Sequence, residues 1–218
     1  MESRFKYKNI RIHKGVNIGR PTQLRRDFQI HFLKLKGLQP NHHLLDVGCG
    51  ALRGGIPLID YLNSGQYTGI EKRKEVHSRA IQELKLYPTL KNKKPKIIFG
   101  DFLTLESPHK FDFIWAFAIL YHIHDNVISK WFSQIEKYLA DGGTFYGQIH
   151  QETHTGWGND KIQGRGSYPI LFRSLEHYQK AAEDNGLVVE DIGPCSDYGH
   201  VGHGPNDDEQ RMLKIQRK

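Results

Sequence analysis

Residues 44–55, LLDVGCGALRGG, decide the fold of this chain. A short apolar run at residues 44–47 leads directly into glycines at positions 48 and 50, and a helical pattern follows. Glycine permits a tight turn and lets a ligand approach the backbone, as it does where a strand opens a nucleotide-binding α/β unit. We therefore predict a buried strand, a ligand-binding loop and a helix, in this order.

Two classes of ligand use such a loop, and the glycine spacing helps to separate them. A dinucleotide site has the pattern G-x-G-x-x-G, with the pyrophosphate at the helix N-terminus. Here Arg53 occupies the third glycine position, and the next glycines fall one residue late. S-adenosylmethionine instead carries an ammonium and a sulfonium, so its site should be acidic. Asp46, two residues before Gly48, meets that demand.

Two further acidic residues follow the next predicted strands. Glu71 ends the strand at residues 67–71, where it is placed to accept hydrogen bonds from two ribose hydroxyls. Asp101 follows the strand at residues 96–100, where its carboxylate can bind an adenine amino group while Phe102 packs on the ring. Acidic residues after strands often only cap the next helix. Three of them after three successive strands favour an adenosyl ligand.

With these motifs the chain resembles the class I (Rossmann-like) S-adenosylmethionine-dependent methyltransferases of the small-molecule type. The matching pieces are LLDVGCGALRGG, YTGIEKR, IIFGDFL, FDFIWAFAILYHI and YLADGGTFYGQI, within residues 44–149. The segment at residues 18–38 is similar to the helix that precedes the motif in many members. The resemblance implies an α/β fold: a Rossmann-like, seven-stranded, mostly parallel sheet in the order 3-2-1-4-5-7-6. Strand 7 is expected to be antiparallel, with helices on both faces and an N-terminal covering helix.

The resemblance also implies which residues contact the cofactor. The expected set is Asp46, Gly48, Cys49, Gly50, Arg53, Glu71, Lys72, Asp101, Phe102 and Phe117. These residues lie at or just beyond the carboxyl ends of predicted strands, where ligands bind in open α/β sheets.

The sequence departs from two subfamilies. After the fourth predicted strand it reads AFAI at residues 116–119 and lacks the Asn/Asp-Pro-Pro-aromatic tetrad. That tetrad holds an amino group that is being methylated, so its absence argues against the usual adenine- and amide-nitrogen enzymes. Pro194-Cys195 resembles the nucleophile pair of cytosine-C5 enzymes, but it follows the sixth predicted strand rather than the fourth. We interpret this pair as unrelated to catalysis.

Short apolar runs alternate with helical patterns after Pro40, which is typical of an α/β sheet. The expected strands are residues 44–47, 67–71, 96–100, 111–118, 143–150, 187–192 and 210–216. A leading helix carries apolar residues from 24 to 35, and a second follows Asp125 as its N-cap. A third lies between Ser174 and Gly186. We expect one domain over residues 1–218, with a basic arm and helix at 1–40 and the Rossmann-like core at 41–218.

A catalytic base would help if the methyl acceptor is a hydroxyl, because its proton must leave as the new bond forms. Histidine titrates near neutrality and is the default candidate. His150 leaves the fifth predicted strand beside the expected methyl group and is our preferred base. The alternatives are His122 and the pair His200 and His203. A reaction without a protein base stays open, because an amine or thiolate acceptor needs only a positioned lone pair.

A cation site is the other interpretation of these histidines. His150 and His154, joined by His200 and His203, have the chemistry to hold a metal ion. Because glycines follow at positions 156 and 158, His150 and His154 are not clearly placed on one face of a helix. We therefore favour a polar acceptor pocket without metal. Residues 151–168 have several glycines and no clear period, and we expect a lid or binding loop there.

The composition favours a cytoplasmic protein. The chain has 218 residues, 38% of them hydrophobic, and a mean hydropathy of −0.60. No apolar stretch is long enough to span a bilayer, so no membrane partner is expected. Two cysteines cannot form a disulfide framework, and the first residues lack an apolar signal region.

The charge is uneven along the chain. Lys and Arg number 31 against 24 Asp and Glu, and the resulting +7 is concentrated before Gly37 and at residues 91–96. Such segments can bind nucleic acid or form a solvated face. We favour methyl transfer from S-adenosylmethionine to an oxygen or nitrogen of a small-molecule acceptor. The alternatives are an RNA-modifying methyltransferase that uses the basic arm and a non-catalytic S-adenosylmethionine-binding module.

Overall fold

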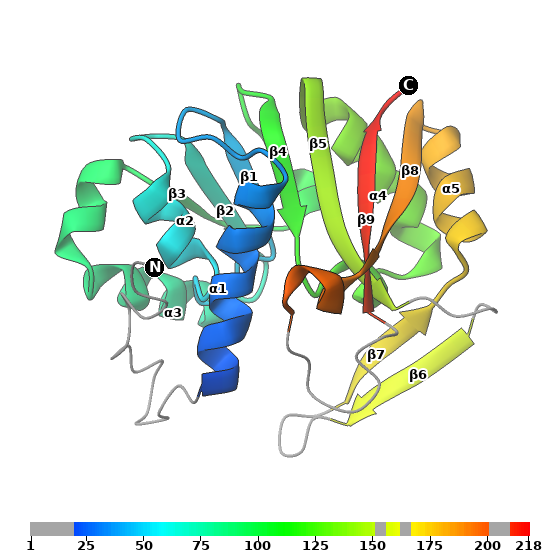
Figure 1. Ribbon diagram of the computed structural model, residues 1–218, viewed down its shortest axis with the longest axis horizontal. Coiled ribbons are helices and arrows are strands. Elements are labelled where there is room, and N and C mark those ends of the chain that lie inside the picture. The colour runs from blue at the N-terminus through cyan, green and yellow to red at the C-terminus, as the bar shows by residue number, and fades with distance from the viewer. Residues whose placement is uncertain (1–19, 151–155, 162–166, 201–209) are drawn as a thin grey trace.

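A seven-stranded sheet forms the centre of the computed structural model, which describes residues 20–150, 156–161, 167–200 and 210–218. Its strands are β1 (Leu44–Val47), β2 (Tyr67–Glu71), β3 (Lys96–Phe99), β4 (Phe111–Ala116), β5 (Leu139–His150), β8 (Leu187–Pro194) and β9 (Gln210–Arg217). They lie in the order β3-β2-β1-β4-β5-β9-β8 (Figure 1). Only β9 runs antiparallel to its neighbours β5 and β8 in this sheet. The expected order and the antiparallel last strand are confirmed.

Helices cover both faces of the sheet (Figure 1). One face carries α1 (Arg20–Leu35), α2 (Gly55–Tyr61) and α3 (Lys74–Lys85), and the other carries α4 (Asp125–Tyr138) and α5 (Leu175–Glu183). Because side chains alternate along a strand, one strand serves both cores. In β4, for example, Trp115 packs in the core under α1 while its neighbour Ile114 packs under α4.

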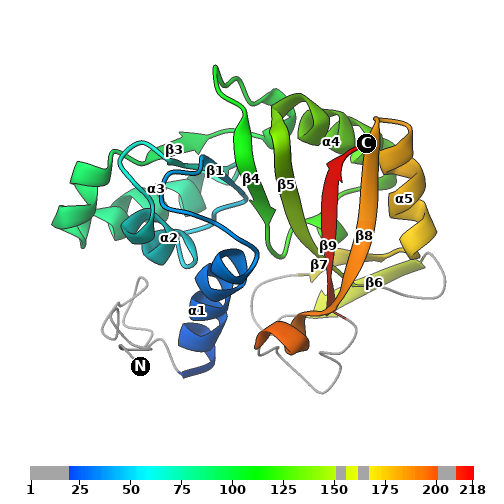
Figure 2. The ribbon, with the colours of Figure 1, turned by 45° about the horizontal axis from the view of Figure 1, so that its top comes forward.

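Helix α1 is the expected covering helix. Its buried side chains include Phe28, Phe32 and Leu33, whereas Lys34 on its outer side is exposed. The helix crosses the sheet in front of β1 and β4, and its N-terminal end projects beyond their carboxyl ends (Figures 1 and 2). This position brings the first turns of α1 to the edge at which parallel strands bind ligands.

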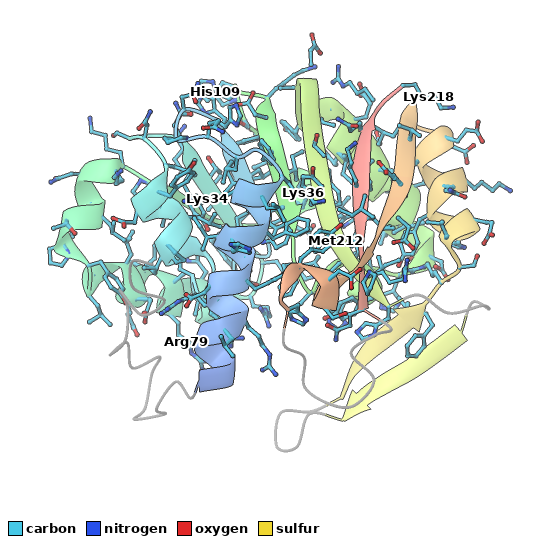
Figure 3. The ribbon with its side chains drawn as sticks, in the orientation of Figure 1. Lys34, Lys36, Arg79, His109, Met212 and Lys218 are labelled. Carbon is cyan, nitrogen blue, oxygen red and sulfur yellow. The ribbon has the colours of Figure 1, made fainter. Side chains whose placement is uncertain are left out.

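Short 3₁₀ turns complete the connections. They are η1 (Pro88–Lys93), η2 (Phe102–Thr104), η3 (Leu120–His122) and η4 (Cys195–Tyr198). The turn η4 packs on the sheet beside Met212 of β9, and the Lys36 ammonium lies 4.4 Å from the ring centre of Tyr198 in that turn (Figure 3). Lys36 thereby ties the end of α1 to η4. In the part of the chain that the structure describes, no helix is both long and apolar enough to cross a membrane.

Two sequence-based expectations need correction. The segment expected to be a lid or loop, residues 151–168, contains β6 (Gly156–Lys161) and the start of β7 (Ser167–Phe172). These strands pair as an antiparallel hairpin, and β7 contacts η3. The sequence did not predict these strands, because glycines interrupt the alternation of polar and apolar side chains that indicates a strand. Asp125 is the first residue of α4 and not its N-cap, which is His124. The Asp125 carboxylate instead accepts a hydrogen bond of 2.7 Å from Nε of the buried Arg173.

Candidate active site

The loop between β1 and α2 has the backbone that its glycines predict. Gly48 and Gly50 have φ angles of +70° and +58°, in the left-handed region that favours glycine. The N–H groups of Gly48 and Cys49 both donate to the Ile70 carbonyl, at 2.8 and 3.1 Å. A Cβ atom on Gly48 would overlap the side chain of Ile119, which follows β4. The loop is therefore held between β2 and the segment after β4.

Asp46 lies beneath this loop and is only 4% exposed. The hydroxyl of Tyr67 donates to its Oδ2 at 2.6 Å. Burial raises the pKa of Asp46 to about 7; the bond from Tyr67 opposes this rise, and the charge of Glu71 adds to it. A carboxylate buried in this way is stabilised by a cation brought next to it. An ammonium group is therefore a fitting ligand here.

Glu71 is the second buried carboxylate and is 2% exposed at the end of β2. Arg73 holds both of its oxygens, with Nε 2.9 Å from Oε1 and Nη2 3.0 Å from Oε2. Burial alone would raise the pKa of Glu71, but hydrogen bonds from Arg73 and from the Gly50 backbone lower it below its ordinary value. Glu71 is thus an ionised acceptor beside the glycine loop.

Asp101 and Lys72 lie next to this pair. Asp101 accepts a hydrogen bond of 3.0 Å from the Leu103 N–H and so caps η2, and its other oxygen lies 3.8 Å from the Lys72 ammonium. Phe102 is turned into the core, with its ring centre 4.7 Å from that of Trp131 in α4. Its ring therefore does not face the carboxyl edge of the sheet. This differs from the expectation that Phe102 packs on the adenine ring.

Cys49 and Arg53 have different positions in the loop. Burial raises the pKa of the Cys49 thiol, and the charges of Asp46 and Glu71 raise it further. The thiol is therefore protonated, and it fills the space over Gly69, where a Cβ atom would lie 2.9 Å from Sγ. Cys49 is a packing residue of the loop, and Arg53 is exposed at its end.

Phe117 and His200 meet in an aromatic cluster at the end of β4. Phe117 stacks on Trp115 at 5.4 Å and 7°, and the ring of Phe28 from α1 lies 5.4 Å away. His200, 9% exposed, lies 5.0 Å from Phe28 and 5.3 Å from Phe117. The structure thus brings a predicted cofactor residue and a predicted base into contact.

His150 and His122 form a second group. Both rings contact Tyr121, with ring centres 4.6 Å and 4.4 Å from it. His150 also lies edge-on to Phe172 of the hairpin, at 6.0 Å. The two histidines therefore flank one tyrosine, whereas His200 belongs to the aromatic cluster described above.

The metal interpretation receives no support from the described residues. His154 and His203 lie outside them, and within them no group of three or more His, Cys, Asp or Glu side chains is arranged to hold a metal ion.

Three polar residues of the site were not predicted from the sequence: Tyr67, Gln148 and Gln29. Gln148 is 2% exposed, accepts a 3.1 Å hydrogen bond from the Ala118 N–H and donates to Gln210 at 2.6 Å. It thereby holds Ala118, whose φ of +58° is unusual for a residue with a side chain. The signal for Gln148 was a polar side chain in an otherwise buried strand.

Gln29 connects α1 to the glycine loop. Its Oε1 accepts a hydrogen bond of 3.0 Å from the Trp115 indole, and a Cβ atom on Gly54 would overlap its amide. Helical periodicity placed Gln29 on α1 but did not show what it would contact.

Comparison with known proteins found a family model and solved structures to which this chain is similar. Residues 45–145 match a family model described as a methyltransferase domain. A solved S-adenosylmethionine-dependent methyltransferase from Clostridium acetobutylicum is similar over 90% of this chain and 92% of its own, with 16% identity and a TM-score of 0.67.

Two further solved structures have the same architecture. The glycopeptide N-methyltransferase MtfA, complexed with S-adenosylhomocysteine, matches 87% of this chain and 88% of its own, at 11% identity and a TM-score of 0.69. The CcbJ methyltransferase from Streptomyces caelestis matches 94% and 93%, at 14% identity and a TM-score of 0.66. Residues 45–145 therefore match a methyltransferase domain, and the chain shares the Rossmann-like fold of these solved methyltransferases. This fold is the one that the family resemblance of the sequence implies.

Proposed function

We propose that this chain binds S-adenosylmethionine at the carboxyl edge of β1, β2 and β4 and transfers its methyl group to an oxygen or nitrogen of a small molecule. One observation carries the proposal: two buried carboxylates, Asp46 and Glu71, flank a glycine loop whose Gly48 leaves no room for a side chain. A site for a pyrophosphate would place cations and free N–H groups there. Two carboxylates suit a ligand with a cationic tail and ribose hydroxyls.

Different residues of the site would bind different groups of the ligand. The ammonium of the cofactor would pair with Asp46, and the ribose hydroxyls would donate to Glu71 in place of Arg73. The adenine amino group would lie at Asp101, whose Oδ2 is on the Lys72 side. When bound, the cofactor supplies an electrophilic methyl group on a positively charged sulfur. The loop after β4 then borders the reacting atoms, which makes the bracing of Ala118 by Gln148 a positioning device.

The protein contributes alignment and, for a hydroxyl acceptor, a base. Holding two reactants in line lowers the barrier because their freedom of motion has already been lost on binding. His150 is our proposed base, since it ends β5 next to Tyr121 and faces Phe172 of the hairpin. His122 and His200 are the alternatives, and an amine acceptor needs none of them.

Calorimetry tests the cofactor. We expect S-adenosylmethionine and S-adenosylhomocysteine to bind, and NAD not to bind. Asp46→Ala and Glu71→Ala should each weaken adenosyl-ligand binding at least tenfold. Glu190→Ala, which removes an exposed carboxylate of β8, should not. Binding of NAD in preference to the adenosyl ligands would reject the proposal.

Turnover is tested by following S-adenosylhomocysteine release with a panel of hydroxyl and amine acceptors. His150→Ala should retain S-adenosylhomocysteine binding and lose most of the activity on hydroxyl acceptors. Wild-type rates in that variant would exclude His150 as the base. Adenosyl-ligand binding without turnover on any acceptor would support a non-catalytic binding module instead.

An RNA acceptor is the second candidate, because three exposed lysines lie close together in the sequence: Lys91 in η1, Lys94 just after it and Lys96 at the start of β3. Binding through phosphates weakens steeply as salt increases. Binding of structured RNA at 50 mM salt that is lost at 300 mM would favour this acceptor. No binding at the lower salt would exclude it.

A further inference from the structure

Arg25 is a buried cation on the face of α1 that packs against the sheet. Its side chain is 9% exposed, although it carries a full charge. Burying a charge is unfavourable without a partner of opposite charge or strong hydrogen bonds. Arg25 has a partner of its own in the structure, so a ligand would share or replace that contact.

Contacts along α1 show where Arg25 lies relative to β4. Phe32 packs on Trp115, inside the strand, at 5.4 Å. Phe28, one turn earlier, packs on Phe117, just past the end of the strand, at 5.4 Å. Because each helical residue advances by about 1.5 Å, Arg25 lies roughly 4.5 Å further in the same direction. It is therefore beyond the carboxyl end of β4, on the part of α1 that projects past the sheet in Figures 1 and 2.

The helical period shows which way Arg25 faces. At about 100° per residue, its direction falls between those of Phe32 and Gln29. Gln29 reaches both the Trp115 indole and the backbone at Gly54. Arg25 precedes Gln29 by one turn on the same side of the helix, so it faces the space between the glycine loop and the end of β4.

This space is where the proposed function places the amino-acid end of the cofactor, and that end carries a carboxylate as well as an ammonium. Asp46 suits the ammonium, but Asp46 and Glu71 together would repel a carboxylate. Resting on the proposed function, we propose that Arg25 binds the carboxylate of the methionine moiety of S-adenosylmethionine. Arg is suited to this role because its planar guanidinium can donate two parallel hydrogen bonds to a carboxylate.

Two ligands that differ only in the carboxylate provide the test. Calorimetry would compare S-adenosylmethionine with decarboxylated S-adenosylmethionine, which keeps the ammonium. The wild type should prefer the carboxylated ligand by about 10- to 100-fold, the range for hydrogen bonds between charged groups. Arg25→Gln should lose this preference by weakening only the carboxylated ligand, and Arg25→Lys should restore part of it.

Two control variants separate this role from general effects of charge. Lys34→Gln removes a cation from the opposite, exposed side of the same helix (Figure 3) and should change neither affinity. Asp46→Asn should weaken both ligands, because both carry the ammonium. Circular dichroism and thermal melting establish that each variant is folded.

The outcomes distinguish failure of this inference from failure of the proposed function. A wild type that binds neither ligand rejects the proposed function. A wild type that binds both equally has no carboxylate site, which overturns the inference even if Arg25→Gln does not fold. Equal weakening of both ligands by Arg25→Gln also overturns it. So does unchanged cofactor binding with a raised KM for acidic acceptors, since Arg25 would then bind the acceptor.

Discussion

Replacing Asp46 by Asn tests whether the buried carboxylate is retained at a cost to stability. Burial raises the pKa of Asp46 from 3.8 to about 7. An acid with a raised folded-state pKa holds its proton more tightly in the folded protein, so the free energy of unfolding falls as pH rises from about 4 to about 7. The full penalty is present above pH 7. At about 1.4 kcal/mol for each pKa unit, it amounts to about 4 kcal/mol at most.

Asp46→Asn removes this penalty with little change of shape, because the amide oxygen can still accept the hydrogen bond from Tyr67. We expect the variant to be more stable than the wild type by about 1–3 kcal/mol at pH 8 and nearly equal to it at pH 4. Urea unfolding of both proteins from pH 4 to pH 8 measures the difference. Burial also raises the pKa of Glu83 to about 7, and comparing two proteins that both contain Glu83 cancels its contribution. The same variant should lose cofactor affinity.

Two results would refute this reasoning. If the Asn variant is less stable than the wild type at pH 8, other groups in the unliganded protein offset the cost of burying the ionised Asp46 carboxylate. A difference that does not change with pH would mean that burial does not control the titration of Asp46. Asp141→Asn is the matched control, since the Asp141 side chain is 95% exposed and pairs with Arg217 at the surface. Its effect should stay within about 1 kcal/mol at every pH.

Three other predictions follow from the same contacts. Because Asp46 must ionise to pair with an ammonium, the affinity for S-adenosylhomocysteine should fall up to about tenfold per pH unit below pH 7, and calorimetry showing pH-independent affinity would contradict this. Arg73→Ala frees both oxygens of Glu71 and should tighten S-adenosylhomocysteine binding severalfold, whereas weaker binding would mean that Arg73 itself contacts the ligand. Asp125→Asn leaves the fully buried Arg173 without its carboxylate and should cost about 2–3 kcal/mol in urea unfolding, below the range for fully buried pairs because Asp125 is partly exposed. A loss under 0.5 kcal/mol would show that the Ile123 carbonyl suffices for Arg173.

The strand order was implied by the family resemblance of the sequence, and local patterns predicted the edge of the sheet at which we propose the site. Apolar runs, glycines and strand-terminal acids are local signals, since each depends on neighbours within a few residues. Asp46, Gly48 and Glu71 were located in this way, because parallel strands of this topology place their carboxyl ends at one edge. The leading helix was found for the same reason, from the spacing of Phe28 and Phe32 along one face.

Tertiary structure decided which side chains meet. Tyr67 and Asp46 lie 21 residues apart and Gln148 and Ala118 lie 30 apart, and only strand pairing brings them within hydrogen-bond distance. The orientation of Phe102 into the core was equally hidden, because an aromatic residue after a strand can pack against either layer. Short-range patterns in the sequence thus determined the strands and the residues of the proposed site. The partners, protonation and exposure of the site residues depend on packing between distant segments, which no local pattern encodes.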